Sequence, residues 1–93
     1  MIHVGDLIKL SKGSIVFNIK ESNKKHLIRQ LNTDEIIFVI SDVSSIKDQY
    51  NCQRIPGKLY LCFDGSSNLA IIRGIHLRFR GEKYEDTKSE GNH

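Results

Sequence analysis

The sequence predicts an all-β fold, mainly a small barrel or a sharply bent antiparallel sheet, with at most one short helix. Segments in which apolar and polar residues alternate recur along the chain, and turn residues separate them. The longest apolar run, Ile36–Ile40, is rich in β-branched residues and has no polar face, which indicates a central strand covered on both sides. A chain of 93 residues has room for one domain. We assign it to residues 1–81, followed by a flexible tail over residues 82–93 that lacks apolar periodicity.

The first half of the chain predicts an antiparallel meander of three successive hairpins. The expected strands are Val4–Leu10, Ser14–Lys20, His26–Leu31 and the central strand. In the second of these, Ile15, Phe17 and Ile19 are expected to face the core and Val16 to face solvent, because side chains alternate along a strand.

The second half predicts a long loop and then further strands. Asp42–Gly57 has no alternation, but Val43, Ile46 and Tyr50 share a helical face, so one or two helical turns are expected there. The strands expected after this loop are Lys58–Phe63, Leu69–Ile72 and Ile75–Arg80. In the last one Ile75, Leu77 and Phe79 are expected to face the core.

Composition excludes several classes of protein. The net charge is only +3, which is a milder basic bias than that of a protein that coats DNA without sequence preference. Neither a signal peptide nor an apolar run of membrane-spanning length is present in this sequence, so a soluble, cytoplasmic protein without membrane contact is expected. Cys52 and Cys62 are expected to be reduced thiols in that compartment.

A row of basic side chains is the constellation that the sequence singles out. On an outward strand face, His76, Arg78 and Arg80 would lie about 6.5–7 Å apart, with Arg73 just ahead of them. Such a row could follow phosphates along a nucleic-acid strand or meet carboxylates on a protein. The simpler interpretation, a solvated face of an edge strand, is somewhat favoured over both. Tyr50 and Arg54, in the long loop, complete the expected partner-binding residues.

The opening segment carries a resemblance. Val4-Gly5-Asp6 leading into a strand, followed by Gly13 and a second strand, resembles the first hairpin of SH3-like and KOW-like barrels, over about the first 20 residues. That resemblance implies a domain that binds protein or nucleic acid. The MazF-type toxin ribonucleases are also similar at the start, but their Arg ahead of Pro-Val-Val is replaced here by Ser14-Ile15-Val16.

No catalytic, cofactor or metal motif is found in the sequence, so no catalytic residue, cofactor or metal is assigned. The leading hypothesis is a non-catalytic interaction module that binds a larger protein partner. Its expected setting is an accessory protein of a phage or mobile element that modulates a host protein. A nucleic-acid-binding barrel is the alternative, and a MazF-like ribonuclease is the third and disfavoured reading.

Overall fold

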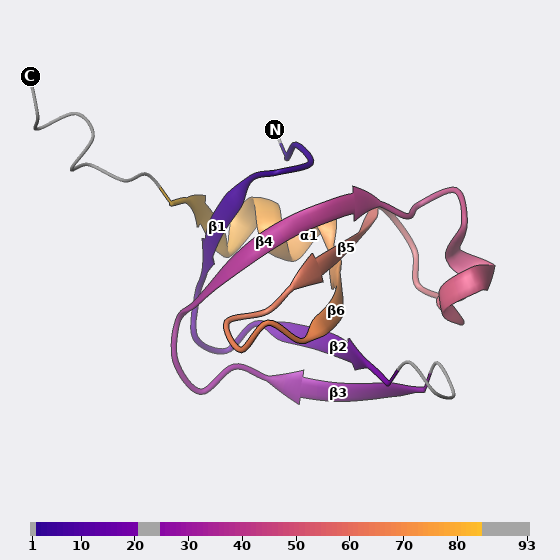
Figure 1. Cartoon of the computed structure of the whole chain (residues 1–93), viewed down its shortest axis with the longest axis horizontal. Coiled ribbons are helices and arrows are strands. Elements are labelled where there is room, and N and C mark those ends of the chain that lie inside the picture. The colour runs from indigo at the N-terminus through magenta and orange to yellow at the C-terminus, as the bar shows by residue number, and fades with distance from the viewer. Residues whose placement is uncertain (1, 21–24, 85–93) are drawn as a thin grey trace, which may run out of the picture.

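The computed structural model describes residues 2–20 and 25–84, and this part of the chain is mostly antiparallel β-sheet with one short α-helix (Figure 1). The fold class predicted from the sequence is confirmed. The strands are β1 (Leu7–Leu10), β2 (Ile15–Ile19), β3 (His26–Gln30), β4 (Glu35–Asp42), β5 (Leu59–Phe63), β6 (Leu69–Arg73) and β7 (Gly81–Lys83). The helices are the 3₁₀-helix η1 (Lys47–Tyr50) and the α-helix α1 (Gly74–Phe79).

The strands form one sheet in the order β3-β2-β6-β5-β4-β1-β7. The middle strand is therefore β5, and the expectation that Ile36–Ile40 would be central is wrong. The expected meander is also wrong, because β1 pairs with β4 and β7, whereas β2 pairs with β3 and β6. Consecutive strands pair in β2–β3 and β5–β6, and in β4–β5 across the long loop that carries η1.

Strand β4 is covered on one face only along much of its length. Ile37 and Val39 are fully buried, whereas Phe38 between them is 40% exposed. The apolar run therefore does not mark a strand with two covered faces, because the outer face at Phe38 is open to solvent.

Two groups of buried side chains lie on opposite faces of the sheet. The inner cluster comprises Ile8, Leu10, Val16, Leu31, Ile37, Val39, Tyr60, Cys62, Ala70, Ile72 and Leu77. The loop-side cluster comprises Val43, Cys52, Leu59 and Ile71, with Phe17, Ile19, Ile46, Tyr50, Ile55 and Leu61 packed against it. Val16 thus faces the inner cluster rather than solvent, because β2, like β5 and β6, contributes alternate residues to both faces.

The long loop after β4 covers the loop-side cluster. Val43 is buried there, and Ile46 and Tyr50 pack against it at either end of η1. The predicted helical turn in this loop is confirmed, although it is a short 3₁₀-helix.

The segment predicted as the last strand is mostly the helix α1. Gly74 N donates to the Lys58 carbonyl at 2.8 Å, after which the chain turns into the helix and places Leu77 in the inner cluster. A side chain at Gly74 would lie only 3.0 Å from Lys58 Cβ, so glycine permits this close approach. The chain then returns to the sheet as β7, which runs past the predicted domain boundary at residue 81. Residues 85–93 of the predicted tail lie outside the described residues.

Candidate functional site

The basic row predicted from the sequence does not exist, because His76 and Arg78 lie on α1 and Arg80 caps its end. The Arg80 backbone N–H donates to the His76 carbonyl at 2.8 Å, as expected one helical turn apart. Side chains two positions apart on a helix do not face the same way. Arg78 therefore projects away from the direction shared by His76 and Arg80.

His76 and Arg73 are tied to the body of the domain. His76 is half-buried, and its Nδ1 lies 3.3 Å from the Ile15 carbonyl oxygen. Arg73 ends β6 and is half-buried, with its Nε enclosed and without a hydrogen-bond partner among the described residues. His76 Nδ1 and Arg73 Nε are therefore not freely available to a partner.

Tyr50 and Arg54 lie in another part of the molecule. The loop that carries them extends beyond the sheet at the far right of Figure 1, whereas α1 lies behind β4 near the middle. The Tyr50 carbonyl is 2.5 Å from His26 Nε2 and accepts a hydrogen bond from the Cys52 thiol at 3.2 Å. Arg54 is exposed. The structure therefore does not bring the six predicted residues into one site.

A groove beside α1 gathers exposed apolar side chains. It encloses about 620 Å³ and is lined by Ile2, Lys58, Tyr60, Gly74, Ile75, Arg78 and Phe79. We call it the α1 groove. Ile75 is 51% exposed and Phe79 is 71% exposed, the highest value among the large apolar side chains described. Their spacing of i and i+4, with Arg78 at i+3, places all three on one helical face.

The α1 groove has a basic character. Lys58 and Arg78 are its charged lining residues, and no carboxylate from the described part of the chain lines it. Lys58 Nζ lies 3.2 Å from the Asp42 carboxylate, so this charge is partly balanced. Within residues 2–20 and 25–84, Arg78 has no salt-bridge partner, and its guanidinium carbon lies 5.3 Å from the centre of the Phe79 ring. Phenylalanine and arginine are both enriched at protein interfaces relative to the rest of the protein surface.

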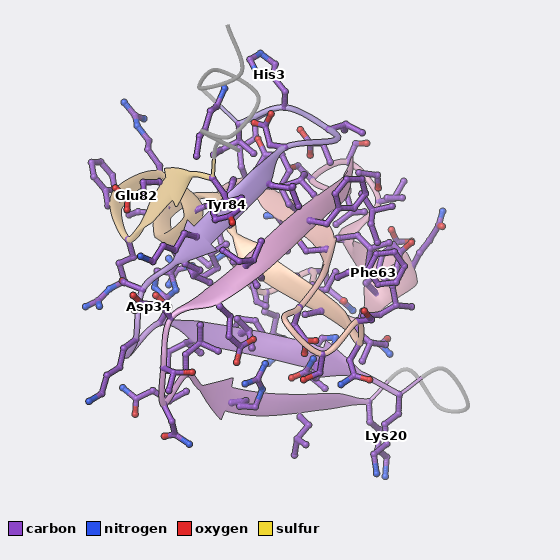
Figure 2. The ribbon with its side chains drawn as sticks, turned by 60° about the vertical axis from the view of Figure 1, so that its left-hand side comes forward. His3, Lys20, Asp34, Phe63, Glu82 and Tyr84 are labelled. Carbon is purple, nitrogen blue, oxygen red and sulfur yellow. The ribbon has the colours of Figure 1, made fainter. Side chains whose placement is uncertain are left out.

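A second apolar surface runs across the outer face of the sheet. Leu7, Phe38 and Phe63 are neighbours in adjacent strands, and Tyr84 N donates to the Leu7 carbonyl at 2.8 Å. Each of these four side chains is 39–50% exposed. Figure 2 looks onto this face, with Tyr84 across β1 and Phe63 further along it.

The carboxylates of Glu35 and Asp64 are engaged in ion pairs and hydrogen bonds. The Arg29 guanidinium bridges Glu35 and Asp64, and Asn18 donates to Asp64 at 2.9 Å. The hydrogen bond from Arg29 holds the pKa of Glu35 below its usual value. Burial acts to raise the pKa of Asp64, but hydrogen bonds from the Asn68 backbone and Asn18 outweigh it and leave that pKa lowered. Neither carboxylate is poised to accept a proton near neutral pH.

Both cysteines are free thiols buried in the fold. Burial raises the pKa of Cys52, and it raises the pKa of Cys62 to about 12. Because the thiolate is the nucleophile, burial disfavours the reactive form of both cysteines. In the described part of the chain, no three His, Cys, Asp or Glu side chains gather as metal ligands. No helix of this part is long and apolar enough to cross a membrane.

Sequence reasoning missed the apolar part of the α1 groove. It assigned Ile75 and Phe79 to the core because both fit an alternating strand. The signal for the groove is the helical spacing of these two residues with Arg78, which becomes visible only once Gly74 is known to begin a helix.

Comparison of the chain with protein-family models, curated proteins and solved structures finds no match.

Proposed function

We propose that this protein is a non-catalytic binding module whose α1 groove accepts a segment of a larger protein partner that combines carboxylates with apolar side chains. The observation that carries the proposal is the position of Phe79, which is 71% exposed in the α1 groove beside Arg78. Among the described residues, Arg78 has no salt-bridge partner and no acidic residue lines the groove. Burying Phe79 against an apolar side chain would stabilise the complex. A carboxylate on the same segment would form a charge-assisted pair with Arg78.

A protein segment fits this groove better than a nucleic acid does. The argument for a nucleic acid depended on a regular row of His76, Arg78 and Arg80, and the helix removes that regular spacing. Ile75 adds a large apolar surface, which a phosphate backbone does not contact favourably. The expected setting, an accessory protein of a phage or mobile element acting on a host protein, stays a prediction.

A peptide selection tests the proposal. A displayed library of random peptides is enriched on the protein, and the binders are expected to combine Asp or Glu with Leu, Ile or Phe. Phe79→Ala and Arg78→Glu should each weaken a selected peptide by about tenfold to a hundredfold, equivalent to about 1.4–2.8 kcal/mol.

Matched controls separate the α1 groove from other surfaces. Phe63→Ala removes an exposed phenylalanine on the outer sheet face, and Arg54→Glu reverses an exposed charge in the long loop. Both controls should leave peptide affinity unchanged. Binding that is lost in Arg54→Glu and retained in Phe79→Ala would move the site to the loop. Selective binding of single-stranded RNA or DNA, with an affinity that falls steeply with salt, would instead support the nucleic-acid alternative.

A further inference from the structure

The two edges of the sheet differ in how well they are protected. At one edge, β7 is a three-residue strand that contacts α1. At the other edge, β3 is a five-residue strand that pairs only with β2 among the described residues. Figure 1 shows β3 at the lower margin, with no described element beyond it. Natural proteins usually blunt such edges with proline, bulges or a covering element, and β3 has no proline and pairs regularly with β2.

Strand β3 also exposes an apolar side chain on each of its faces. Leu27 is 59% exposed and Ile28 is 66% exposed. Consecutive residues of a strand point to opposite faces, so no single face of this edge is polar. An edge of this kind is a template for another strand.

The outward hydrogen-bonding groups of β3 can be assigned from its pairing with β2. Leu31 N donates to the Ser14 carbonyl, and the Lys25 carbonyl accepts from Lys20 N, so the odd-numbered residues point toward β2. Backbone groups alternate in direction along an antiparallel strand. The N–H and C=O groups of His26, Ile28 and Gln30 therefore point away from the sheet.

We infer that β3 pairs with β3 of a second copy of this chain, antiparallel and about a two-fold axis at Ile28. In that register, Ile28 faces its own symmetry mate, and His26 faces Gln30 of the other copy. All three outward residues of each strand then form hydrogen bonds, because each pairs with another outward residue. In any other antiparallel register of these two strands, at least one of His26, Ile28 and Gln30 lacks an outward-pointing partner residue.

The side chains are compatible with the same register. Leu27 comes to lie opposite Arg29 of the other copy, whose aliphatic stem would cover it. The charge of Arg29 is already balanced within its own subunit by Glu35 at 2.7 Å and Asp64 at 3.1 Å. The pairing therefore brings no two uncompensated arginines together.

Sedimentation equilibrium tests the pairing on the full chain. The mass should rise from monomer to dimer between about 10 μM and about 1 mM, the range for a small interface. Ile28→Pro should keep the protein monomeric throughout, because it removes an outward N–H without touching the β2 ladder. Ile28→Lys should do the same by placing two like charges in register. Val4→Lys, at a 63% exposed site outside the strands, should not change the dimer.

Cysteine cross-linking tests the register. Ile28→Cys should form a disulfide-linked dimer on mild oxidation, since directly paired α-carbons lie about 5.5 Å apart. Gln30→Cys should not, because the two positions would be about 13–14 Å apart. The native cysteines are buried and do not interfere. A protein that stays monomeric to about 1 mM overturns the inference, as does a dimer that survives both Ile28→Lys and Ile28→Pro. If Ile28→Pro does not fold, the pairing is tested by Ile28→Lys and by the cross-linking of Ile28→Cys compared with Gln30→Cys.

Discussion

The Arg29 guanidinium donates two parallel hydrogen bonds to the Glu35 carboxylate, from Nη1 to Oε2 at 2.7 Å and from Nη2 to Oε1 at 3.1 Å. The two residues lie on β3 and β4, which follow each other in the chain but are not neighbours in the sheet. The same guanidinium reaches Asp64 at 3.1 Å in the turn between β5 and β6. Arg29 therefore links the edge strand β3 to β4 and to the β5–β6 turn, although β2 and β6 lie between β3 and β5 in the sheet.

Arg29→Ala should destabilise the fold by about 2–3 kcal/mol, because it leaves a buried carboxylate without its cation. Asp64 is only 5% exposed and retains hydrogen bonds from Asn18 and the turn, which keeps the loss below that of an isolated buried charge. Chemical denaturation measures the change. Lys12→Ala, at an exposed site, is the control and should change the unfolding free energy by about 0.5 kcal/mol or less.

Acid should unfold the protein partly through Glu35 and Asp64. Both have a pKa lowered by the fold, from ordinary values of 4.5 and 3.8, so their contribution is complete above those values. It is lost as the pH falls through the lower folded pKa values. Melting temperature should therefore be level above about pH 5 and fall below about pH 4. The fall should be shallower in Arg29→Ala, and an equal fall in both proteins would contradict this assignment.

Two neighbouring residues of β4 should differ sharply in their contribution to stability. Ile37→Ala should cost about 2–5 kcal/mol, because Ile37 is fully buried in the inner cluster. Phe38→Ala should cost only about 1 kcal/mol, because the ring is 40% exposed. From the sequence alone, Phe38→Ala would be expected to lower the free energy of unfolding by about 3–5 kcal/mol, because the ring was expected to be buried. Comparable losses of stability for both substitutions would support the original interpretation, in which both faces of β4 are covered.

Gly81→Ala should destabilise the join between α1 and β7 by about 1–3 kcal/mol. A Cβ there would lie 2.6 Å from both Ile8 Cγ2 and the Leu77 carbonyl oxygen, and the backbone oxygen cannot simply rotate away. Thermal unfolding measures the loss. Glu82→Ala, at the next and exposed position, should leave the melting temperature nearly unchanged.

The sequence was sufficient for the fold class and for most strand positions, because alternation and turn residues are local signals. It was not sufficient for strand order. β1 pairs with β4, and β2 pairs with β6, across long separations that no local pattern encodes. Residues 11–14 join the first two strands of the predicted meander, but their backbone instead bonds to residues outside β2. Ser11 N donates to the Arg80 carbonyl, and Gly13 N donates to the Leu31 carbonyl.

The candidate site was predicted only in part for the same reason. Arg78 was identified, but Ile75 and Phe79 were assigned to the core because apolar residues at i, i+2 and i+4 fit a strand. In the helix only Leu77 of these three is buried. Six residues are too few to distinguish the two periods, and packing of Leu77 against the inner cluster decides between them.

The most direct test of the proposed function is a map of amide chemical shifts in the isotope-labelled protein, titrated with a selected acidic and apolar peptide. The proposal predicts that the perturbed amides cluster around the α1 groove, at Tyr60, Ile75, Arg78 and Phe79, and that those of the long loop and β3 stay unchanged. Perturbations centred on Tyr50 and Arg54, or on the outer sheet face at Phe38, would contradict it.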